Sequence, residues 1–469
     1  MAMKFSSLTS ILFTFGLIAS PLGATLANEA DLQQLTNASE SSDLAFDIVK
    51  SLTIEVGPRI AGSEGDKKAV AWAEAKLKTL GFDKVYKQPV RVRNWSRGLA
   101  EAKIISPYEH SVVITALGGS VATPKGGLKA EVLMVESLEA LQQTPPEDVS
   151  GKIVFINKKM QRDRAGKGYG PVVVGRSQGA IEAARANAQA ILIRSVGTDN
   201  SRFAHTGAMR YSPDVKKIPA GALSNADADT LEAMFDTTNP VTMHVNMQAK
   251  EHGWQTSYNV IGEITGSEKP NEFIHLAAHL DSWDEGTGAL DDGAGVGIVT
   301  AAATLVKNTL GQPKRSIRVV LYANEEFGLI GAKQYTKDNA DTLEQIIVAA
   351  ESDFGAGSIY QIDTRFAAPA LPFAKKLEKA LKPLGIKLGP NTATGGPDIY
   401  MLPAKGVPVV SLRQDGTYYF DYHHTPNDTL DKINLDDIRQ NQTAYAIFAY
   451  MMANSDVDPR PAPELEPAQ

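Results

Sequence analysis

The stretch from Ile274 to Val299 reads IHLAAHLDSWDEGTGALDDGAGVGIV and decides how the chain folds. The apolar run at 273–278 is short enough to form a buried strand, and it ends at His279. A glycine-rich turn that carries Asp291 follows, and the small and apolar residues after it predict a helix packed closely on a sheet. An open α/β sheet places its active site where such a strand ends beside a helix start. His279 and Asp291 are donors that suit zinc, although an ordinary strand, turn and helix with polar caps would show the same pattern.

Beyond this stretch, strands and helices alternate as far as residue 453. Apolar runs predict strands at 258–264, 273–278, 317–323, 346–352 and 407–412, and helical spacing predicts helices at 293–308, 328–339, 371–383 and 436–453. Alternation of this kind requires crossover connections, and therefore a parallel sheet. The sequence predicts the α/β fold class, with a mainly parallel sheet flanked by helices.

The rest of the chain shows a less regular pattern of predicted helices and strands. Helical spacing and alternation predict helices within 28–56 and at 69–80, and a strand at 84–92. Further on, short strands surround one alanine-rich helix, 179–190, without a cluster of ligand-type residues. We interpret 119–251 as a small α+β domain inserted into a main domain formed by 28–118 and 252–455. The tail, 456–469, contains four prolines and is predicted to be disordered.

The composition and the N-terminal sequence narrow the range of possible functions. The net charge of −7 argues against nucleic acid or an anionic membrane as a partner. There is no cysteine, so disulfides, thiolate ligands and cysteine nucleophiles are excluded, and any metal must be held by His, Asp and Glu. Lys4, the mostly apolar stretch 8–18 and the small residues before Ala27 predict a secretory signal peptide over 1–27. We expect the mature protein to be periplasmic or secreted, and no later stretch to cross a membrane.

Four of the predicted strands end in residues that bind metals. Because the carboxyl ends of parallel strands meet at one edge of a sheet, side chains far apart in the sequence are expected to converge there. A single acid in such a place is usually a helix cap or a surface residue, but four successive strands with such ends are hard to explain in that way. The residues concerned are His279 with Asp281, Glu325 with Glu326, Glu351 with Asp353, and His423 with His424.

This chemistry suggests a hydrolase with two metal ions. Two divalent ions about 3.5–4 Å apart need a bridging carboxylate and terminal ligands for each ion. Asp291 is the natural bridge. The terminal ligands would be His279 and Asp353 for one ion, and Glu326 and His424 for the other. Glu325 then remains free to act as the general base. Asp281 lies two residues after His279 and can accept the second N–H of its ring.

Four motifs together resemble the co-catalytic zinc aminopeptidase clan, and most of all its carboxypeptidase Q branch. They are HLDSWDEGTGALDDGAG, NEEFGLIGA, ESDFGAG and HHTPNDTL. The resemblance implies a zinc exopeptidase fold, two zinc ions per chain, small peptides or dipeptides as substrates, and a homodimer. The segments GKIVFINK, GAIEAARANAQAILIRS and IPAGALS are similar to a protease-associated domain.

The resemblance also implies roles for single residues. His279, Asp291, Glu326, Asp353 and His424 match the family's metal ligands, and Asp281 and Glu325 match its catalytic residues. The family spacing H-T-x-x-D-T-L selects His424 over His423, with Asp428 as its support. The family further implies a cis peptide bond between Asp291 and Asp292.

Other functions compete with this interpretation. Residues 175–179 match the G-x-S-x-G elbow of a serine hydrolase, in which Ser177 would be the nucleophile. A metal-free binding protein and a glutaminyl cyclase-like acyl transferase with one metal ion share the fold. Within the peptidases, a carboxypeptidase needs a cation such as Arg365 or Arg413 for the terminal carboxylate. An aminopeptidase needs an acid such as Asp398 for the free amine.

Overall fold

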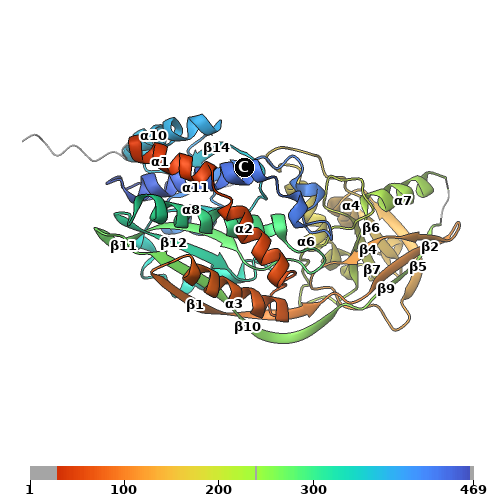
Figure 1. Ribbon diagram of the computed structural model, residues 1–469. Helices are drawn as coiled ribbons and strands as arrows, with labels where there is room; N and C mark the ends of the chain where they lie inside the picture. Colours follow the sequence, from red (N-terminus) through yellow and green to blue (C-terminus); the bar gives the residue numbers. More distant parts are fainter. Residues whose placement is uncertain (1–28, 238–239, 465–469) are drawn as a thin grey trace, which may run out of the picture.

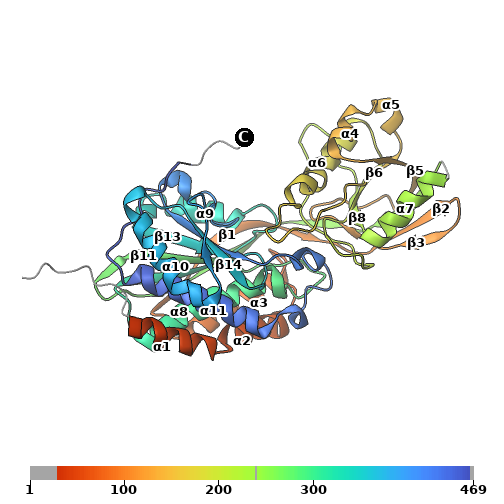
Figure 2. The ribbon, with the colours of Figure 1, turned by 90° about the horizontal axis from the view of Figure 1, so that it is seen from above.

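The computed structural model describes residues 29–237 and 240–464, which form two lobes, each built on an eight-stranded sheet (Figures 1 and 2). The predicted signal peptide lies outside the described residues. The larger lobe carries the sheet that the sequence predicts. In sheet order its strands are β1 (Lys84–Ser96), β10 (Lys250–Ile264), β12 (Arg315–Tyr322), β11 (Lys269–His279), β13 (Ile346–Glu351), β16 (Val409–Gln414), β14 (Ile359–Thr364) and β15 (Lys387–Leu388).

The centre of this sheet is parallel and both of its margins contain antiparallel pairs. Strands β12, β11, β13 and β16 run parallel, whereas β10 pairs antiparallel with β12, and β14 with β16. All residues of β12 and β13 are buried, as expected for central strands covered on both faces. The predicted fold class is therefore confirmed. Strands β14 and β15, which extend the sheet beyond β16, are not among the strands predicted from the sequence.

Helices cover both faces of the large sheet (Figure 2). They are α1 (Glu29–Glu40), α2 (Leu44–Ser51), α3 (Glu64–Thr79), α8 (Ala294–Leu310), α9 (Ile330–Asp338), α10 (Leu371–Leu381) and α11 (Leu435–Ala453). The small residues of α8 allow close packing, since a Cβ at Gly297 would come 2.6 Å from the carbonyl oxygen of Ala45 in α2. The segment Ala289–Leu310 is long and apolar enough to span a membrane, contrary to the sequence-based expectation, but its most apolar stretch is buried inside the protein, as in a core helix.

The second lobe comprises residues 100–247. Its sheet order is β3 (His110–Val112), β2 (Ala100–Ser106), β9 (Thr242–Met247), β5 (Leu128–Val135), β6 (Ile153–Ile156), β7 (Ala190–Arg194), β8 (Ala220–Leu223) and β4 (Ile114–Ala116). Its helices are α4 (Leu138–Gln143), α5 (Pro146–Val149), α6 (Gly170–Arg185) and α7 (Asn225–Thr237). The expected boundary at residue 119 is too late, because β2 pairs with β9 and β4 with β8.

The structure also excludes one competing interpretation and corrects one expectation. Residues 175–179 lie inside α6, which begins with Pro171 in its first turn, so there is no strand and no sharp turn before Ser177. This excludes the nucleophile elbow. The tail is ordered as far as residue 464, because Ala462 N donates to Gly406 O and the Arg365 guanidinium holds the carbonyls of Pro463 and Glu464.

Candidate active site

All seven predicted site residues meet at the carboxyl edge of the parallel centre. His279 ends β11, Glu325 and Glu326 follow β12, and Asp353 follows β13. His424 comes from the loop after β16. Asp291 lies in the turn before α8 and Asp281 just after β11. The convergence follows from parallel strands that end at one edge of a sheet.

Asp291 lies between the two histidines and turns one carboxylate oxygen to each. Its Oδ1 is 3.1 Å from His279 Nε2, and its Oδ2 is 3.2 Å from His424 Nε2. Beyond Asp291, the same nitrogen of His279 lies 3.5 Å from Asp353 Oδ1, and that of His424 lies 3.1 Å from Glu326 Oε2. The donors thus form two sets that share one carboxylate.

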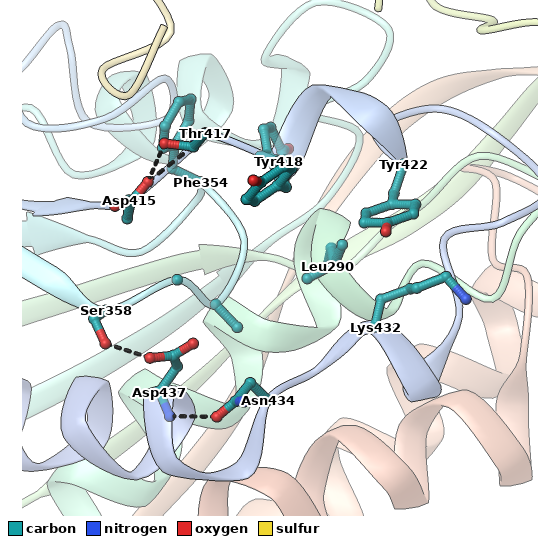
Figure 3. A pocket seen from close by; sticks show the side chains of 13 residues that line it. Leu290, Phe354, Ser358, Asp415, Thr417, Tyr418, Tyr422, Lys432, Asn434 and Asp437 are labelled. Carbon is teal, nitrogen blue, oxygen red and sulfur yellow. Dashed lines mark hydrogen bonds between the residues drawn. The ribbon is translucent and has the colours of Figure 1, made fainter. Parts of the chain in front are cut away.

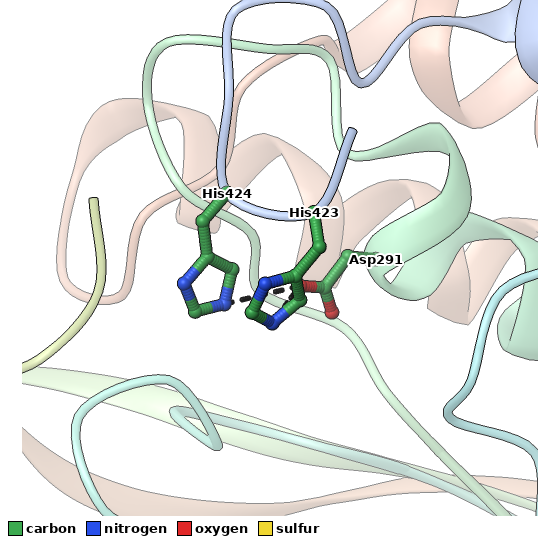
Figure 4. A group of neighbouring side chains, drawn as sticks. All are labelled: Asp291, His423 and His424. Atoms are coloured by element: carbon green, nitrogen blue, oxygen red, sulfur yellow. Dashed lines mark ion pairs between the residues drawn. The ribbon is translucent and has the colours of Figure 1, made fainter. Parts of the chain in front are cut away.

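His423 is a neighbour of this arrangement rather than its centre. Its ring stacks on that of His424 with centroids 3.5 Å apart, and its Nε2 is 3.7 Å from Asp291 Oδ2 (Figure 4). His424 lies closer to Asp291 and also reaches Glu326. The geometry therefore agrees with the choice of His424 over His423.

The cluster is buried and strongly charged. Although burial disfavours the imidazolium, the carboxylates of Asp353 and Asp291 raise the pKa of His279 well above its usual value. Burial raises the pKa of Glu325, and the neighbouring carboxylates of Asp353 and Glu326 raise it further. Among the described residues, Asp291 Oδ2 and Glu326 Oε1 accept no hydrogen bond. Buried carboxylates crowded in this way fit a site for cations, because buried charges are otherwise paired.

The observed contacts of Asp281 differ in detail from the predicted one. The His279 ring nitrogen Nδ1 lies 3.0 Å from the backbone oxygen of Asp281 and 3.6 Å from its carboxylate. The carboxylate instead accepts from the backbone N–H of Glu325 at 3.0 Å. Asp281 therefore orients His279 through its main chain and Glu325 through its side chain.

The turn that carries Asp291 is fixed by a carboxylate far away in the sequence. Asp428 accepts hydrogen bonds from the backbone N–H groups of Ala289, Leu290 and Asp291 at 2.9, 2.6 and 3.2 Å. Burial raises the pKa of Asp428 to about 7. The sequence suggests Asp428 as a support of His424, whereas the hydrogen bonds of its carboxylate go to the turn of Asp291. The peptide bond Asp291–Asp292 is cis, as the resemblance implies.

Two more side chains hold the same region. The Arg59 guanidinium is fully buried and donates to the carbonyl oxygens of Leu280, Thr287 and Gly288 at 2.6, 2.7 and 2.9 Å. Asp292 accepts from the backbone N–H groups of His279 and Gly295, so it shapes the turn. No pattern in the sequence indicates this role of Arg59, which lies beside a helix-breaking Gly-Pro pair.

Trp283 is another contact that the sequence did not suggest. Its Nε1 donates to Glu326 Oε2 at 2.5 Å, and its ring packs against His424 with centroids 5.5 Å apart. A tryptophan N–H usually finds an acceptor when it is buried. Here that acceptor is a carboxylate of the cluster, so Trp283 fixes Glu326 and shields His424.

Two cavities lie near the cluster, and Phe354 lines both of them. One, of about 380 Å³, is lined by Asp353 and Glu351 together with Tyr360, Tyr400 and Arg413. The other, of about 490 Å³, is lined by Leu290, Tyr418, Tyr422 and Lys432, among others (Figure 3). The first includes a residue of the cluster and is the better candidate for a substrate cavity, although it is the smaller of the two.

The residues proposed to recognise a peptide terminus differ in whether they line the cavity. Arg365 is buried and its guanidinium is occupied by backbone carbonyls, including those of Thr392 and Ala393, so it does not face a ligand. Asp398 is 1% exposed and does not line the cavity. Arg413 does line it.

A buried set of histidines and carboxylates at the carboxyl edge of a mixed α/β sheet defines a metal-dependent hydrolase. Comparison with known proteins gives the family. Residues 259–449 match the family described as Peptidase family M28. Carboxypeptidase Q of Mus musculus is 36% identical over 86% of this chain and 84% of its own length. The chain belongs to peptidase family M28, in its carboxypeptidase Q branch, and is an exopeptidase of that family.

Solved structures agree with this assignment. A Peptidase M28 precursor from Shewanella amazonensis SB2B is 54% identical, with a TM-score of 0.92 over 93% of this chain and all of that one. BSAP, a zinc aminopeptidase from Bacillus subtilis, shares the fold with a TM-score of 0.64 at 19% identity, over 90% of this chain and 98% of its own.

Proposed function

We propose that this protein is an exported exopeptidase that uses two zinc ions to cleave dipeptides or other small peptides next to a free terminus. The observation that carries the proposal is the position of Asp291, with one carboxylate oxygen facing each histidine. His279 and Asp353 would complete the ligand set of one ion, and Glu326 and His424 that of the other. The donors are all nitrogen and oxygen, which suits zinc, and the zinc aminopeptidase from Bacillus subtilis shares the fold.

The zinc pair, when bound, would supply Lewis acidity to the scissile carbonyl and to the attacking water. The chain itself supplies the proton transfer. Glu325 is only partly buried and follows β12 at the edge of the cluster, so it is placed to take a proton from the water and deliver it to the leaving amine. The hydrogen bond from its backbone N–H to Asp281 holds it beside the ligands. Asp281 and Glu325 are the catalytic side chains of this proposal.

Arg413 supports a carboxypeptidase or dipeptidase. Its Nε donates to Asp363 at 2.7 Å, and among the described residues its two terminal amino groups make no hydrogen bond. Its side chain is 40% exposed and lines the cavity that also contains Asp353. A guanidinium in that position fits the free carboxylate of a short peptide, because its paired N–H groups match two carboxylate oxygens.

An aminopeptidase of the same clan is the second candidate. The observation in its favour is that an acid, Glu351, also lines the cavity, although its carboxylate already accepts the backbone N–H groups of Asp398 and Ile399. Assays on free dipeptides and on peptides blocked at either end separate the two. We expect a C-terminal amide to abolish turnover and an N-terminal acetyl group to be tolerated. The opposite pattern would establish the aminopeptidase.

The substitution Arg413→Gln tests the residue itself. It should raise KM for free dipeptides at least tenfold, since hydrogen bonds to charged groups contribute about 1.5–3 kcal/mol each. It should leave the inhibition constant of a C-terminally amidated dipeptide, measured as a competitor, unchanged, which makes the amide the matched control. An equal rise in both constants would remove Arg413 from substrate recognition.

The proposal also covers the export of the protein, its oligomeric state and the class of domain to which the second lobe belongs. We infer that residues 1–27 are cleaved during export, so the N-terminal sequence of the mature protein should begin at Asn28, and an intact Met1 would contradict this. The second lobe is proposed to be a protease-associated domain, on its sequence resemblance. A homodimer rests on the family alone, and light scattering tests it, with a monomer as the contradicting result.

A further inference from the structure

The loop that carries His424 has a backbone conformation that depends on contacts from outside the loop. His424 has φ of 62°, in the left-handed region that side chains other than glycine rarely adopt. Such residues cost about 1–3 kcal/mol and persist only where the surroundings fix them. The groups that fix this loop therefore decide where the His424 ring points.

Those groups come from the second lobe. The backbone N–H of Thr206 donates to the carbonyl of His424 at 3.0 Å, and the ring nitrogen Nδ1 of His205 lies 2.7 Å from the carbonyl oxygen of His423. Near the start of the loop, the backbone N–H of Thr198 donates to Phe420 O at 3.0 Å. A single segment, 198–206, thus satisfies three carbonyls of the loop.

The same segment contacts the His424 ring. Its Nδ1 lies 3.2 Å from the backbone oxygen of Thr206, on the opposite side of the ring from the nitrogen that faces Asp291 and Glu326. A histidine that binds a metal through one nitrogen usually donates the other N–H to a carbonyl or carboxylate. Here that carbonyl belongs to the other lobe.

His205 is the side chain that ties this segment together. It is completely buried, and its Nε2 lies 2.7 Å from Asp199 Oδ1, so the ring is clamped between a carboxylate and the loop carbonyl. Asp199 is itself held by the backbone N–H of Ser201 and by Asn225. There is no spare room, because a Cβ at Gly197 would lie 2.2 Å from the His205 ring.

We propose that His205, braced by Asp199, is a positioning residue for the metal ligand His424, so that the second lobe completes the active site. His205 contacts no substrate and acts through the main chain of the loop. Without its hydrogen bond, the carbonyl of His423 loses its partner and the left-handed turn relaxes. The inference rests on the proposed metal site and adds to it a role for the second lobe.

The test is zinc affinity, measured by competition with a chromophoric chelator on the full-length mature protein. His205→Leu, which removes both ring nitrogens, should weaken zinc binding about 10–100-fold, the range known for residues that orient metal ligands. It should lower kcat and leave KM unchanged. His205→Asn retains a donor near the position of Nδ1 and should recover most of the lost affinity.

A matched control lies in the same lobe. Tyr211 donates to Ile218 O at 2.6 Å and accepts from the backbone N–H of Val121, away from the loop. Tyr211→Phe should lower the melting temperature of the zinc-free protein and leave zinc affinity unchanged. If His205→Leu does not fold, Asp199→Asn replaces it, with a smaller loss of affinity expected.

The outcomes separate the two claims. If the wild type binds no zinc, the proposed function fails. If the wild type binds zinc and the variants of His205 and Asp199 bind it as tightly, the metal site stands and the positioning role is overturned. Equal losses in Tyr211→Phe and His205→Leu would also overturn it, because general loosening of the lobe would then explain both.

Discussion

Removing the Asp428 carboxylate should loosen the turn that carries Asp291. The carboxylate accepts three backbone N–H groups, from Ala289, Leu290 and Asp291. A buried donor left without an acceptor costs about 1–3 kcal/mol, so Asp428→Ala should destabilise the protein by about 3–6 kcal/mol once the turn relaxes. Asp428→Asn keeps one oxygen for Ala289 and Leu290 and should cost about 1–3 kcal/mol.

Thermal unfolding followed by tryptophan fluorescence measures this. At roughly 2 cal/mol/K of unfolding entropy per residue, a lobe of nearly three hundred residues loses about 1.7 °C of Tm per kcal/mol. We expect Tm to fall by about 5–10 °C for Asp428→Ala and about 2–5 °C for Asp428→Asn. Unfolding should be measured in the presence of a metal chelator, so that metal binding does not contribute to Tm. The pH should be 8, above the pKa of about 7 for Asp428.

Asp431 provides the control. It lies three residues further on with its side chain 69% exposed, and Asp431→Ala should leave Tm almost unchanged. If Asp428→Ala melts within a degree of the wild type, or if the Asn and Ala variants lose the same amount, the carboxylate does not hold the turn as described.

The remaining predictions concern catalysis and pH. Glu325→Gln should lower kcat at least ~10²–10⁴-fold with zinc content retained, because it removes the proton acceptor, and near-normal turnover in a steady-state assay would rule that role out. Ser177→Ala should leave kcat unchanged in the same assay, since Ser177 lies inside a helix; a large loss would revive the serine hydrolase. Burial raises the pKa of Asp66 to about 6. The folded protein therefore holds a proton there more tightly than the unfolded chain, and the stability that this site contributes is present near pH 4 and lost as the pH rises through about 6. Relative to Asp66→Asn, the wild type should gain Tm as the pH falls from about 7 to about 5, and a difference that does not change with pH would contradict the assignment.

The part of the fold that carries the site could be predicted from the sequence. The central strands each contain a largely apolar run, and acids or histidines stand at the end of each strand or in the loop that follows it, so two local signals coincide. The parallel arrangement then brings these ends to one edge, as His279, Glu326 and Asp353 illustrate. Nothing in this step requires knowledge of the sheet order.

The strands at the margin of the sheet could not be predicted in this way. Strand β14 contains the half-buried polar or amphipathic residues Tyr360 and Gln361, and β15 is two residues long, so neither forms an apolar run. Residues 172–174 of α6 show the opposite case. Their β-branched side chains favour a strand, but they lie in a helix that has Pro171 in its first turn, and short apolar runs fit either structure.

The side chains that support the site were the hardest to predict. Arg59 contacts carbonyls more than 220 residues away, and Asp428 contacts the turn about 138 residues before it. Both contacts are to the main chain, which has no sequence signature. The role of His205 was hidden for the same reason, since its segment lies in the other lobe and contains no metal-ligand motif.

The zinc content per chain shows whether Asp291 joins two zinc sites. Elemental analysis of the purified mature protein, after dialysis against zinc and then against metal-free buffer, should give two zinc ions per wild-type chain. Asp291→Ala, prepared in parallel, should give fewer than one. A wild-type protein without zinc, or a variant that retains both ions, would contradict the account.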